Sequence, residues 1–303
     1  MATEVLCIGQ AVVDCITRGV ESDPLGMGKT RADSITLNLG GDAVNESFVL
    51  TSLGRQAGLM CAVGDDLAGR FVMQEASRRG LDVSGMSMIP GLVTPVANMF
   101  VKLDGSRSSV TSAASLLPGY VPSAGFVREC VRGGTRIVSF ASLFRAPLDQ
   151  APVVCELIKA AHEGGAIVCA DTKIPTFRSM SLEELAPVLP MIDYIFPNDT
   201  EAAFLTEMSE AEADYEGMAA RLLERGIGHV VIKTGEKGCY AASLDGHFAV
   251  PALKVPVVDT TGAGDNLVAG FMDALLRGYS FRECCEAGIR TAADSVQHLG
   301  ATI

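Results

Sequence analysis

Tryptophan is absent from this 303-residue chain, and histidine occurs only four times. None of the histidines is paired at the spacing of metal ligands, and no CxxC sequence occurs, so a structural zinc site is not expected. The nine cysteines are scattered without the regular spacing of a disulfide framework. They indicate reduced thiols and therefore a cytoplasmic protein.

The chain also lacks long apolar runs and clusters of positive charge. No run reaches the ~18–20 apolar residues that span a bilayer, and the N-terminus lacks the basic start and cleavage site of a signal peptide. The net charge of −12 argues against binding to nucleic acid or to an anionic membrane. Apolar residues make up 48% of the chain, which is enough for one large domain, alone or with a small appendage.

Strand-like and helical segments alternate from about residue 120 onward. The expected strands lie at 135–142, 165–172, 193–198 and 228–235, and the expected helices at 151–164, 181–191 and 215–227. Short apolar strands that alternate with helices predict a parallel sheet covered on both faces. Ligands of such sheets bind beyond the carboxyl ends of the strands.

The N-terminal third departs from this alternation. Residues 4–16 have the pattern of a first strand, with Asp14 near its end. Residues 17–41 and 91–113 are also strand-like, and an Asp-Gly pair in the second segment predicts a hairpin. We expect 12–38 and 94–112 to form a small β-sheet lid, and 1–11, 39–93 and 113–303 to form the α/β core. Exposed lid edges favour pairing of two chains, so a homodimer is expected.

The stretch VVDTTGAGDNLVAGFMDALLRG, residues 257–278, is the most informative part of the chain. A β-type run at 254–261 precedes a segment with helical periodicity, and Gly278 is placed to end that helix. Residues 262–264 then lie where the helix begins, and its N–H groups and dipole suit an anion. Asp265 beside such a site is explained by acceptance of a proton from a nucleophile that attacks a phosphate. The alternative is an ordinary turn with an acidic residue in the first helical turn.

Two segments resemble the signatures of the ribokinase-like (PfkB) carbohydrate kinases: DTTGAGDNLVAGFMDAL, 259–275, and GGDAVNESFVLTSLG, 40–54. The resemblance extends from about Cys7 to Gly300. It implies a ribokinase-like three-layer α/β/α fold with a mostly parallel central sheet and a small β lid. It also implies a phosphotransferase that transfers the γ-phosphoryl group of ATP, with Mg²⁺, to an alcohol group of a small sugar or sugar derivative. Asp265 would be the base, and the anion hole would consist of Gly262, Ala263 and Gly264.

The resemblance assigns further residues to the nucleotide and to Mg²⁺. Asn198 and Glu201 match an N-x-x-E motif, in which Glu201 would hold Mg²⁺ through water. The alternative for this pair is a capping box at a helix N-terminus. Lys233, Gly235 and Gly238 lie in a strand and glycine loop that is expected beside the nucleotide, although the string alone shows only a strand followed by a turn.

The acceptor side of the site departs from ribokinases. The resemblance places the sugar-binding residues at Asp14, Gly40, Gly41 and Asn45. However, Val12 and Asp42 stand where ribokinases carry Asn and Lys, so ribose is not the expected acceptor. Lys173 stands where a neutral amide is common; it either meets an acidic or phosphorylated sugar or is a surface lysine.

A monovalent cation site, with K⁺ as the expected ion, is a further implication of the resemblance. The matching side chains and the segments that would supply carbonyl groups are Asp259, Thr261, Ser295, His298 and Gly300.

Three other functions are considered. A nucleoside kinase of the same fold needs an apolar, often aromatic lid, but Phe100 is the only aromatic residue in the expected hairpin. A non-catalytic sugar-binding protein is disfavoured because Asp265 is present. A dehydrogenase needs G-x-G-x-x-G after the first strand, and CIGQAVVD lacks it.

Overall fold

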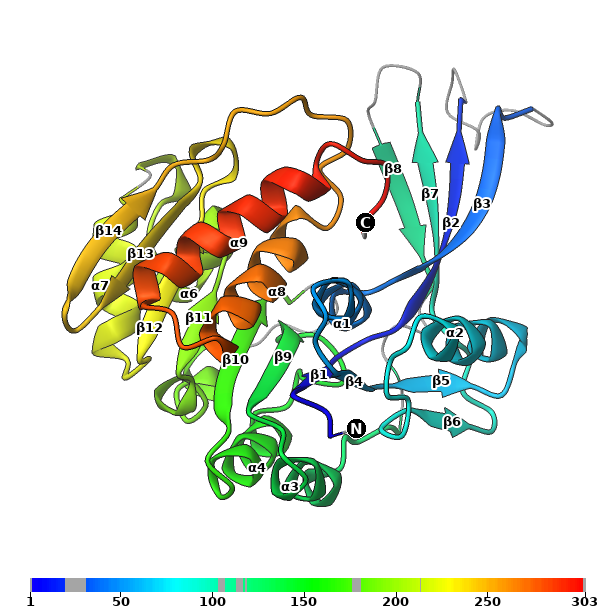
Figure 1. The fold of residues 1–303 in the computed structure, drawn as a ribbon, viewed down its shortest axis with the longest axis horizontal. Coiled ribbons are helices and arrows are strands. Elements are labelled where there is room, and N and C mark those ends of the chain that lie inside the picture. Colours follow the sequence, from blue (N-terminus) through cyan, green and yellow to red (C-terminus); the bar gives the residue numbers. More distant parts are fainter. Residues whose placement is uncertain are drawn as a thin grey trace.

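An eight-stranded sheet forms the centre of the molecule (Figure 1). The computed structural model describes residues 2–19, 31–102, 107–112, 117, 119–175, 181–212 and 214–301. The strands of the main sheet, in spatial order, are β14 (Gly246–Val250), β13 (Cys239–Ser243), β12 (His229–Lys233), β11 (Tyr194–Phe196), β10 (Ile167–Thr172), β9 (Ile137–Leu143), β1 (Val5–Ile8) and β4 (Ala57–Met60). The pairs from β4 to β12 are parallel, whereas β13 and β14 are antiparallel additions at one edge.

Helices cover both faces of this sheet. The helices that contribute to one buried cluster are α1 (Asp42–Ser52), α2 (Leu67–Arg78), α8 (Ala263–Leu276) and α9 (Phe281–Ser295). Those that contribute to the opposite cluster are α3 (Ala124–Arg132), α4 (Ala151–His162), α5 (Leu182–Leu185), α6 (Asp199–Thr206) and α7 (Tyr215–Glu224). Short 3-10 turns are η3 (Leu189–Met191), η4 (Glu210–Glu212) and η5 (Gly235–Lys237).

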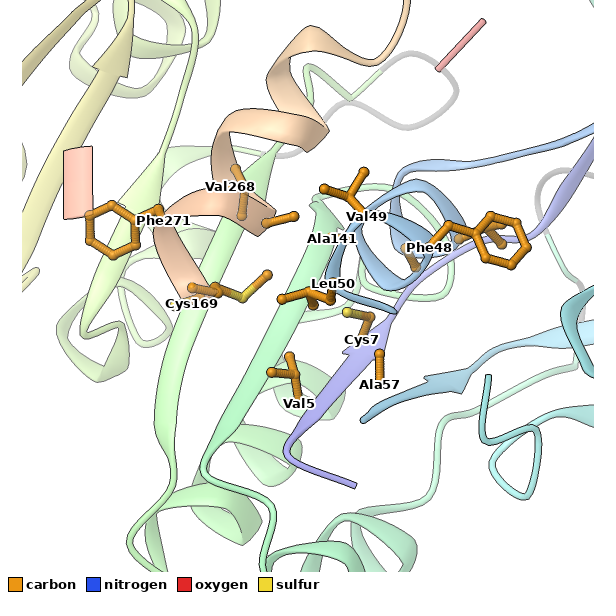
Figure 2. Packing of buried hydrophobic residues seen from close by; sticks show 14 of the residues in the cluster. Val5, Cys7, Phe48, Val49, Leu50, Ala57, Ala141, Cys169, Val268 and Phe271 are labelled. Atoms are coloured by element: carbon orange, nitrogen blue, oxygen red, sulfur yellow. The ribbon is translucent and has the colours of Figure 1, made fainter. Parts of the chain in front are cut away.

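Strand β1 shows how the two cores are separated. Its residues alternate between the clusters: Val5 and Cys7 pack on the side of α1 and α8, and Leu6 and Ile8 pack on the other side. Figure 2 shows Val5 and Cys7 beside side chains of α1 such as Leu50. All four β1 residues are at most 1% exposed, as expected for a parallel strand covered on both faces. The predicted three-layer α/β/α architecture with a mainly parallel sheet is confirmed.

A second sheet contains β3 (Ser34–Gly40), β2 (Val12–Arg18), β7 (Val96–Val101) and β8 (Arg107–Thr111), in this spatial order. It projects from the main body beside the C-terminal segment (Figure 1). Strands β7 and β8 pair antiparallel, which confirms the predicted hairpin, although its Asp-Gly turn lies outside the described residues. Residues 20–30 of the other strand-like segment also lie outside them. Strands β5 (Ala62–Gly64) and β6 (Ser87–Ile89) form a small third sheet. The division into core and lid stays a prediction.

The prediction of one strand over residues 4–16 is wrong. Strand β1 pairs with β4 and β9 in the main sheet, whereas β2 pairs with β3 and β7 in the second sheet. Both strands contain buried apolar residues, so the apolar pattern continues from one strand into the next. The pattern therefore does not show that the chain passes from the main sheet to the second sheet. Asp14 is therefore the third residue of β2 and does not lie at the end of the first strand.

The predicted β run at 254–261 is also wrong. These residues belong to no strand, and all of them are exposed or half-buried. Pro251 and Pro256 lack the N–H groups that a ladder requires, and the amides of Val258 and Asp259 both donate to the carbonyl of Val296. Helix α8 is thus preceded by an extended loop and not by a strand.

Helix boundaries were predicted with different success. Gly262 is the N-cap of α8, and Gly278 follows its C-cap with a φ of 80°, as expected for a glycine that ends a helix. The helix expected at 181–191 is broken into α5 and η3, because Pro187 and Pro190 interrupt it. Within the part of the chain described here, no helix combines the length and apolar character needed to cross a membrane.

Candidate active site

Asp265 lies in the first turn of α8, close to the carboxyl edge of the main sheet. Its side chain is only 4% exposed, and the Nδ2 group of Asn45 on α1 donates a hydrogen bond of 2.6 Å to its Oδ2 atom. Helix α1 therefore orients the carboxylate from across the site. Asn45 was expected to bind the acceptor; in the structure its amide nitrogen contacts Asp265, while its Oδ1 atom is buried without a partner among the described residues.

The environment of Asp265 increases its affinity for a proton. Burial is the first cause and the nearby negative charge of Asp42 the second; Lys173 and the hydrogen bond from Asn45 oppose them only in part. Together they raise the pKa of Asp265 from about 4 to about 8. A carboxylate of this kind accepts a proton readily near neutral pH, as a general base must.

The glycines before Asp265 have separate structural requirements. Gly262 has a φ of 73°, in the left-handed region, and a Cβ atom there would lie 2.6 Å from Cβ of Ala301. Gly264 instead faces Lys233, whose Nζ atom would lie 3.4 Å from an added Cβ. Amide groups in the first turn of a helix lack intrahelical partners. The amide of Ala263 donates to the carbonyl of Thr260 at 3.3 Å, and Gly264 brings the start of the helix against the Lys233 ammonium group. Their role as an anion hole, which includes Ala263, stays a prediction.

Lys233 is held by a fully buried carboxylate. Its Nζ atom lies 2.5 Å from Oδ1 of Asp171, the residue before the last of β10. The other oxygen of Asp171, Oδ2, is buried and has no hydrogen-bond partner in the described part of the chain. Gly235 begins η5 and Gly238 follows it, so both lie in the turn directly after Lys233.

The capping alternative for Asn198 and Glu201 is realised in the structure. Oδ1 of Asn198 accepts from the amide of Glu201 at 2.8 Å, and the amide of Asn198 donates to Oε2 of Glu201 at 2.9 Å. Thr172 also donates to that oxygen, and Glu201 is 5% exposed. Asn198 forms a parallel bridge with Lys233, so this cap lies directly beside the lysine. The metal role of Glu201 stays a prediction.

Direct metal ligation is not visible around this cap. Over the described ranges, no cluster of three or more His, Cys, Asp or Glu side chains is arranged to hold a metal ion. Mg²⁺ bound through water and phosphate needs fewer protein ligands, however. The unpartnered Oδ2 of Asp171, close to Glu201, is an oxygen of the type that Mg²⁺ and its water ligands bind.

Three of the residues expected to bind the acceptor lie where β2, β3 and α1 meet, and the name acceptor wall is used for this place. A Cβ atom on Gly40 would collide with the carboxylate of Asp14, so only glycine leaves room for that side chain. Burial, followed by the negative charge of Asp42, raises the pKa of Asp14 to about 6. Gly41 is the N-cap of α1, and its φ of 98° begins the helix at Asp42. The predicted residues Asp14, Gly40 and Gly41 are therefore neighbours.

Lys173 is not a surface lysine, and that alternative is wrong. Its side chain is 28% exposed, and its Nζ atom lies 3.5 Å from Oδ2 of Asp42. Although burial would lower the pKa of Lys173, the carboxylates of Asp42, Asp171 and Asp265 raise it, so the ammonium form persists. Ser142 at the end of β9 also donates to Asp42. Ser142 has a φ of 70°, a conformation that is costly for a residue with a side chain and is often retained at functional sites.

A second buried carboxyl group lies behind Asp265 and was not expected from the sequence. Glu46 on α1 is completely buried, and Ser139 of β9 donates to its Oε2 atom at 2.6 Å. Burial, and then the charge of Asp171, raises the pKa of Glu46 well above its usual value. No sequence pattern indicated this residue. Asp171 and Ser142, in contrast, follow from the rule that ligands bind at the carboxyl ends of parallel strands.

A cleft of about 610 Å³ separates the second sheet from the loop that leads into α8. The β2 residues on its wall are Asp14, Ile16 and Arg18, and the opposite wall contains 257–261 and 299–301. The expected cation residues Asp259, Thr261 and Gly300 are thus neighbours at this cleft. Ser295 is buried at the end of α9, and His298 is exposed.

Comparisons with known proteins agree with this architecture. The family model described as pfkB family carbohydrate kinase matches residues 2–303. A ribokinase of Schizosaccharomyces pombe is 27% identical over 285 residues, which cover 89% of this chain and 84% of that protein. A deoxyribokinase of Salmonella typhi is 24% identical over 310 residues, covering 98% of this chain and 94% of that protein. The structure of Arabidopsis thaliana ribokinase complexed with ribose and ATP superimposes with a TM-score of 0.81 at 23% identity, covering 99% and 95% of the two chains, and shows the fold.

Replacement of Asp265 by Asn should reduce the loss of stability at higher pH. Between pH 4 and 8 the native state retains a proton on Asp265 that the unfolded state has released, so this group lowers the free energy of unfolding as pH rises. Urea denaturation from pH 5 to 8 should show that the free energy of unfolding declines less steeply with pH for Asp265→Asn than for the unmodified protein. Asp294→Asn, an exposed change on α9, should follow the unmodified protein. Parallel curves for all three proteins would contradict the raised pKa.

Proposed function

We propose that this chain, a phosphotransferase that belongs to the pfkB family of carbohydrate kinases, transfers the γ-phosphoryl group of ATP to a hydroxyl group of a small neutral sugar. The observation that carries the proposal is the position of Asp265. Its buried carboxylate, with raised pKa, lies in the first turn of α8 and follows Gly264, which faces the ammonium group of Lys233. A proton acceptor and an anion-binding helix start therefore occur at one place.

The reaction follows from this placement. Asp265 takes the proton from the attacking hydroxyl while the amides at 262–264 and Lys233 stabilise the charge on the transferring phosphoryl group. Asn45 keeps the Oδ2 atom of Asp265 fixed, so the base needs little reorganisation before transfer. Lys233 is shared with Asp171, which holds the ammonium group in place before ATP binds.

Mg²⁺ would be held at the sheet edge by Glu201 through water, with the unpartnered oxygen of Asp171 close by. When bound, the ion neutralises part of the charge on the phosphates. The chain itself contributes the capping arrangement that fixes Glu201 and the lysine that faces the helix start.

A neutral acceptor is favoured by the charges at the acceptor wall. Asp14 and Asp42 present carboxylates, and Lys173, the cation that an acidic sugar would need, is already paired with Asp42. Arg79 and Lys102, which also line the cleft, are the cations that a phosphorylated sugar would have to use. The names of the similar proteins, ribokinase and deoxyribokinase, support a sugar of pentose size.

The alternative of a nucleoside acceptor is less well supported. The cleft-facing side of the second sheet presents Ile16, Met99 and Val101, which are aliphatic or thioether side chains. Phe100 alternates to the opposite face, so it is not available to stack on a base from this side.

Asp265→Asn should lower kcat by about 10²- to 10⁴-fold, the usual contribution of a positioned base. The amide keeps the size of the side chain but cannot accept the proton, and ATP affinity should hold because no side-chain volume is added beside the phosphates. Coupled ADP release with saturating sugar, together with calorimetric ATP binding, measures both effects. Asp294→Asn is the matched control. Near-normal turnover by folded Asp265→Asn would refute the proposed mechanism.

Asp14→Ala should weaken acceptor binding by about 1–3 kcal/mol because the hydroxyl groups of the sugar lose a buried acceptor. The KM for the acceptor should rise accordingly, whereas the KM for ATP should change little. The assay is a screen of neutral pentoses and hexoses against sugar acids and sugar phosphates, with Asp245→Ala as an exposed control. Equal losses for sugar and ATP would indicate misfolding, and a preference for sugar phosphates would exclude the neutral acceptor.

A homodimer through the second sheet is also proposed, with that sheet acting as a lid over the cleft. The face opposite the cleft exposes Ile35, Leu37 and Val110, which are 66%, 58% and 52% exposed. Three large apolar side chains on one sheet face favour contact with a second copy. Light scattering should report a dimer that Leu37→Lys converts to a monomer, whereas Leu244→Lys, at an isolated exposed position, leaves it intact. A monomer at high concentration before any substitution would contradict the dimer.

A further inference from the structure

The carboxylate of Asp259 connects three segments around the cleft. Its Oδ1 atom accepts from the amide of Thr261 at 2.9 Å and from the hydroxyl of Thr261 at 2.6 Å. Its Oδ2 atom accepts from the amide of Gly300 at 3.1 Å and lies 3.6 Å from Nη2 of Arg18. The loop before α8, the C-terminal segment and strand β2 therefore meet at one side chain.

These contacts do not fit the monovalent cation that the family resemblance implies at this position. A carboxylate offers about four acceptor positions; hydrogen bonds from Thr261 and Gly300 use three of them on Asp259, and the guanidinium group of Arg18 forms an ion pair on the side of Oδ2. The positive charge beside it is already supplied by the guanidinium group of Arg18. The carbonyl of Ser295, another expected ligand, accepts from the amide of His298 at 3.1 Å. K⁺ at this place would have to compete with the guanidinium group of Arg18, which is part of the chain and is therefore always present.

We propose that Arg18 replaces the monovalent cation, so that the enzyme is independent of K⁺. The inference rests on the proposed function, because it concerns the loop that leads into the anion hole. Arg18 is a positioning residue: it neutralises Asp259, and Asp259 in turn fixes the backbone at Thr261, one residue before Gly262. Both partners are largely covered, with side-chain exposures of 29% and 16%, so their attraction is screened less than that of a surface pair.

The test compares the unmodified enzyme with Arg18→Ala in buffers whose only monovalent cation is K⁺, Na⁺ or tetramethylammonium. The unmodified enzyme should have the same kcat in all three. Arg18→Ala should lose about tenfold in tetramethylammonium and recover most of it in K⁺, because a small cation can then occupy the vacated position. Arg70→Ala, which removes an exposed arginine of α2 that is paired with Asp65, is the matched control and should behave as the unmodified enzyme.

A second measurement does not depend on catalysis. In the absence of ATP and sugar, K⁺ should raise the Tm of Arg18→Ala above its value in tetramethylammonium, and should leave the Tm of the unmodified protein unchanged. This result separates the inference from the proposed function, because it holds even if Asp265→Asn shows that the mechanism is wrong. Should Arg18→Ala fail to fold, Arg18→Lys and Arg18→Gln take its place. The lysine variant should stay independent of K⁺, and the glutamine variant should respond to it.

Two outcomes would overturn the proposal. Activation of the unmodified enzyme by K⁺, with a matching rise in Tm, would show that the ion binds despite Arg18. A folded Arg18→Ala that is impaired equally in all three buffers, with no change in Tm on addition of K⁺, would show that Arg18 acts through packing and not as a cation.

Discussion

The negative charge gathered at the carboxyl edge of the main sheet is the constraint on which the site depends. Asp42, Asp171 and Asp265 meet there, and Lys173 and Lys233 are the cations that make their burial tolerable. Each pair also fixes an element: Lys173 connects the end of β10 to α1, and Lys233 connects β12 to β10. Burial and the negative charge of Asp42 raise the pKa of Asp265, and Lys173 opposes them only in part.

Local sequence patterns predicted most helices and strands, but they did not predict which sheet a strand joins or which distant side chains form pairs. The alternation after residue 120 predicted the parallel strands, and the glycines around 262 predicted the start of α8. The single strand at 4–16 failed because an apolar pattern is the same whichever sheet a strand joins. Pairs such as Arg18 with Asp259 were beyond reach, since each joins residues far apart in the sequence and neither has a local signature. The sequence showed Asp42 and Lys173 as two separate departures from the residues common in related kinases. Only the fold shows that their opposite charges lie side by side and compensate each other.

The pleat of the second sheet decides which side chains of β2 face the cleft and which face away from it. Side chains alternate along β2, so Asp14, Ile16 and Arg18 face the cleft while Cys15 and Thr17 turn away. A shift of one residue in register would turn Asp14 and Arg18 away from the cleft together. The placement of Asp14 and Arg18 at the cleft therefore depends on the pairing of β2 with β3 and β7, which flank it on both sides.

Strand β2 carries both Asp14 and Arg18, so it couples the residue expected to bind the sugar to the residue that contacts Asp259. Asp14 and Arg18 lie on the same face, about 13 Å apart along an extended strand. Under the proposed function, a sugar bound at Asp14 would lower the entropic cost of holding Arg18 against Asp259. Thermodynamic linkage is reciprocal, so assembly of the loop before α8 must strengthen sugar binding by the same factor. Under the proposed function, the strand would thereby disfavour a fully assembled phosphoryl site in the absence of an acceptor, which would protect ATP from transfer to water.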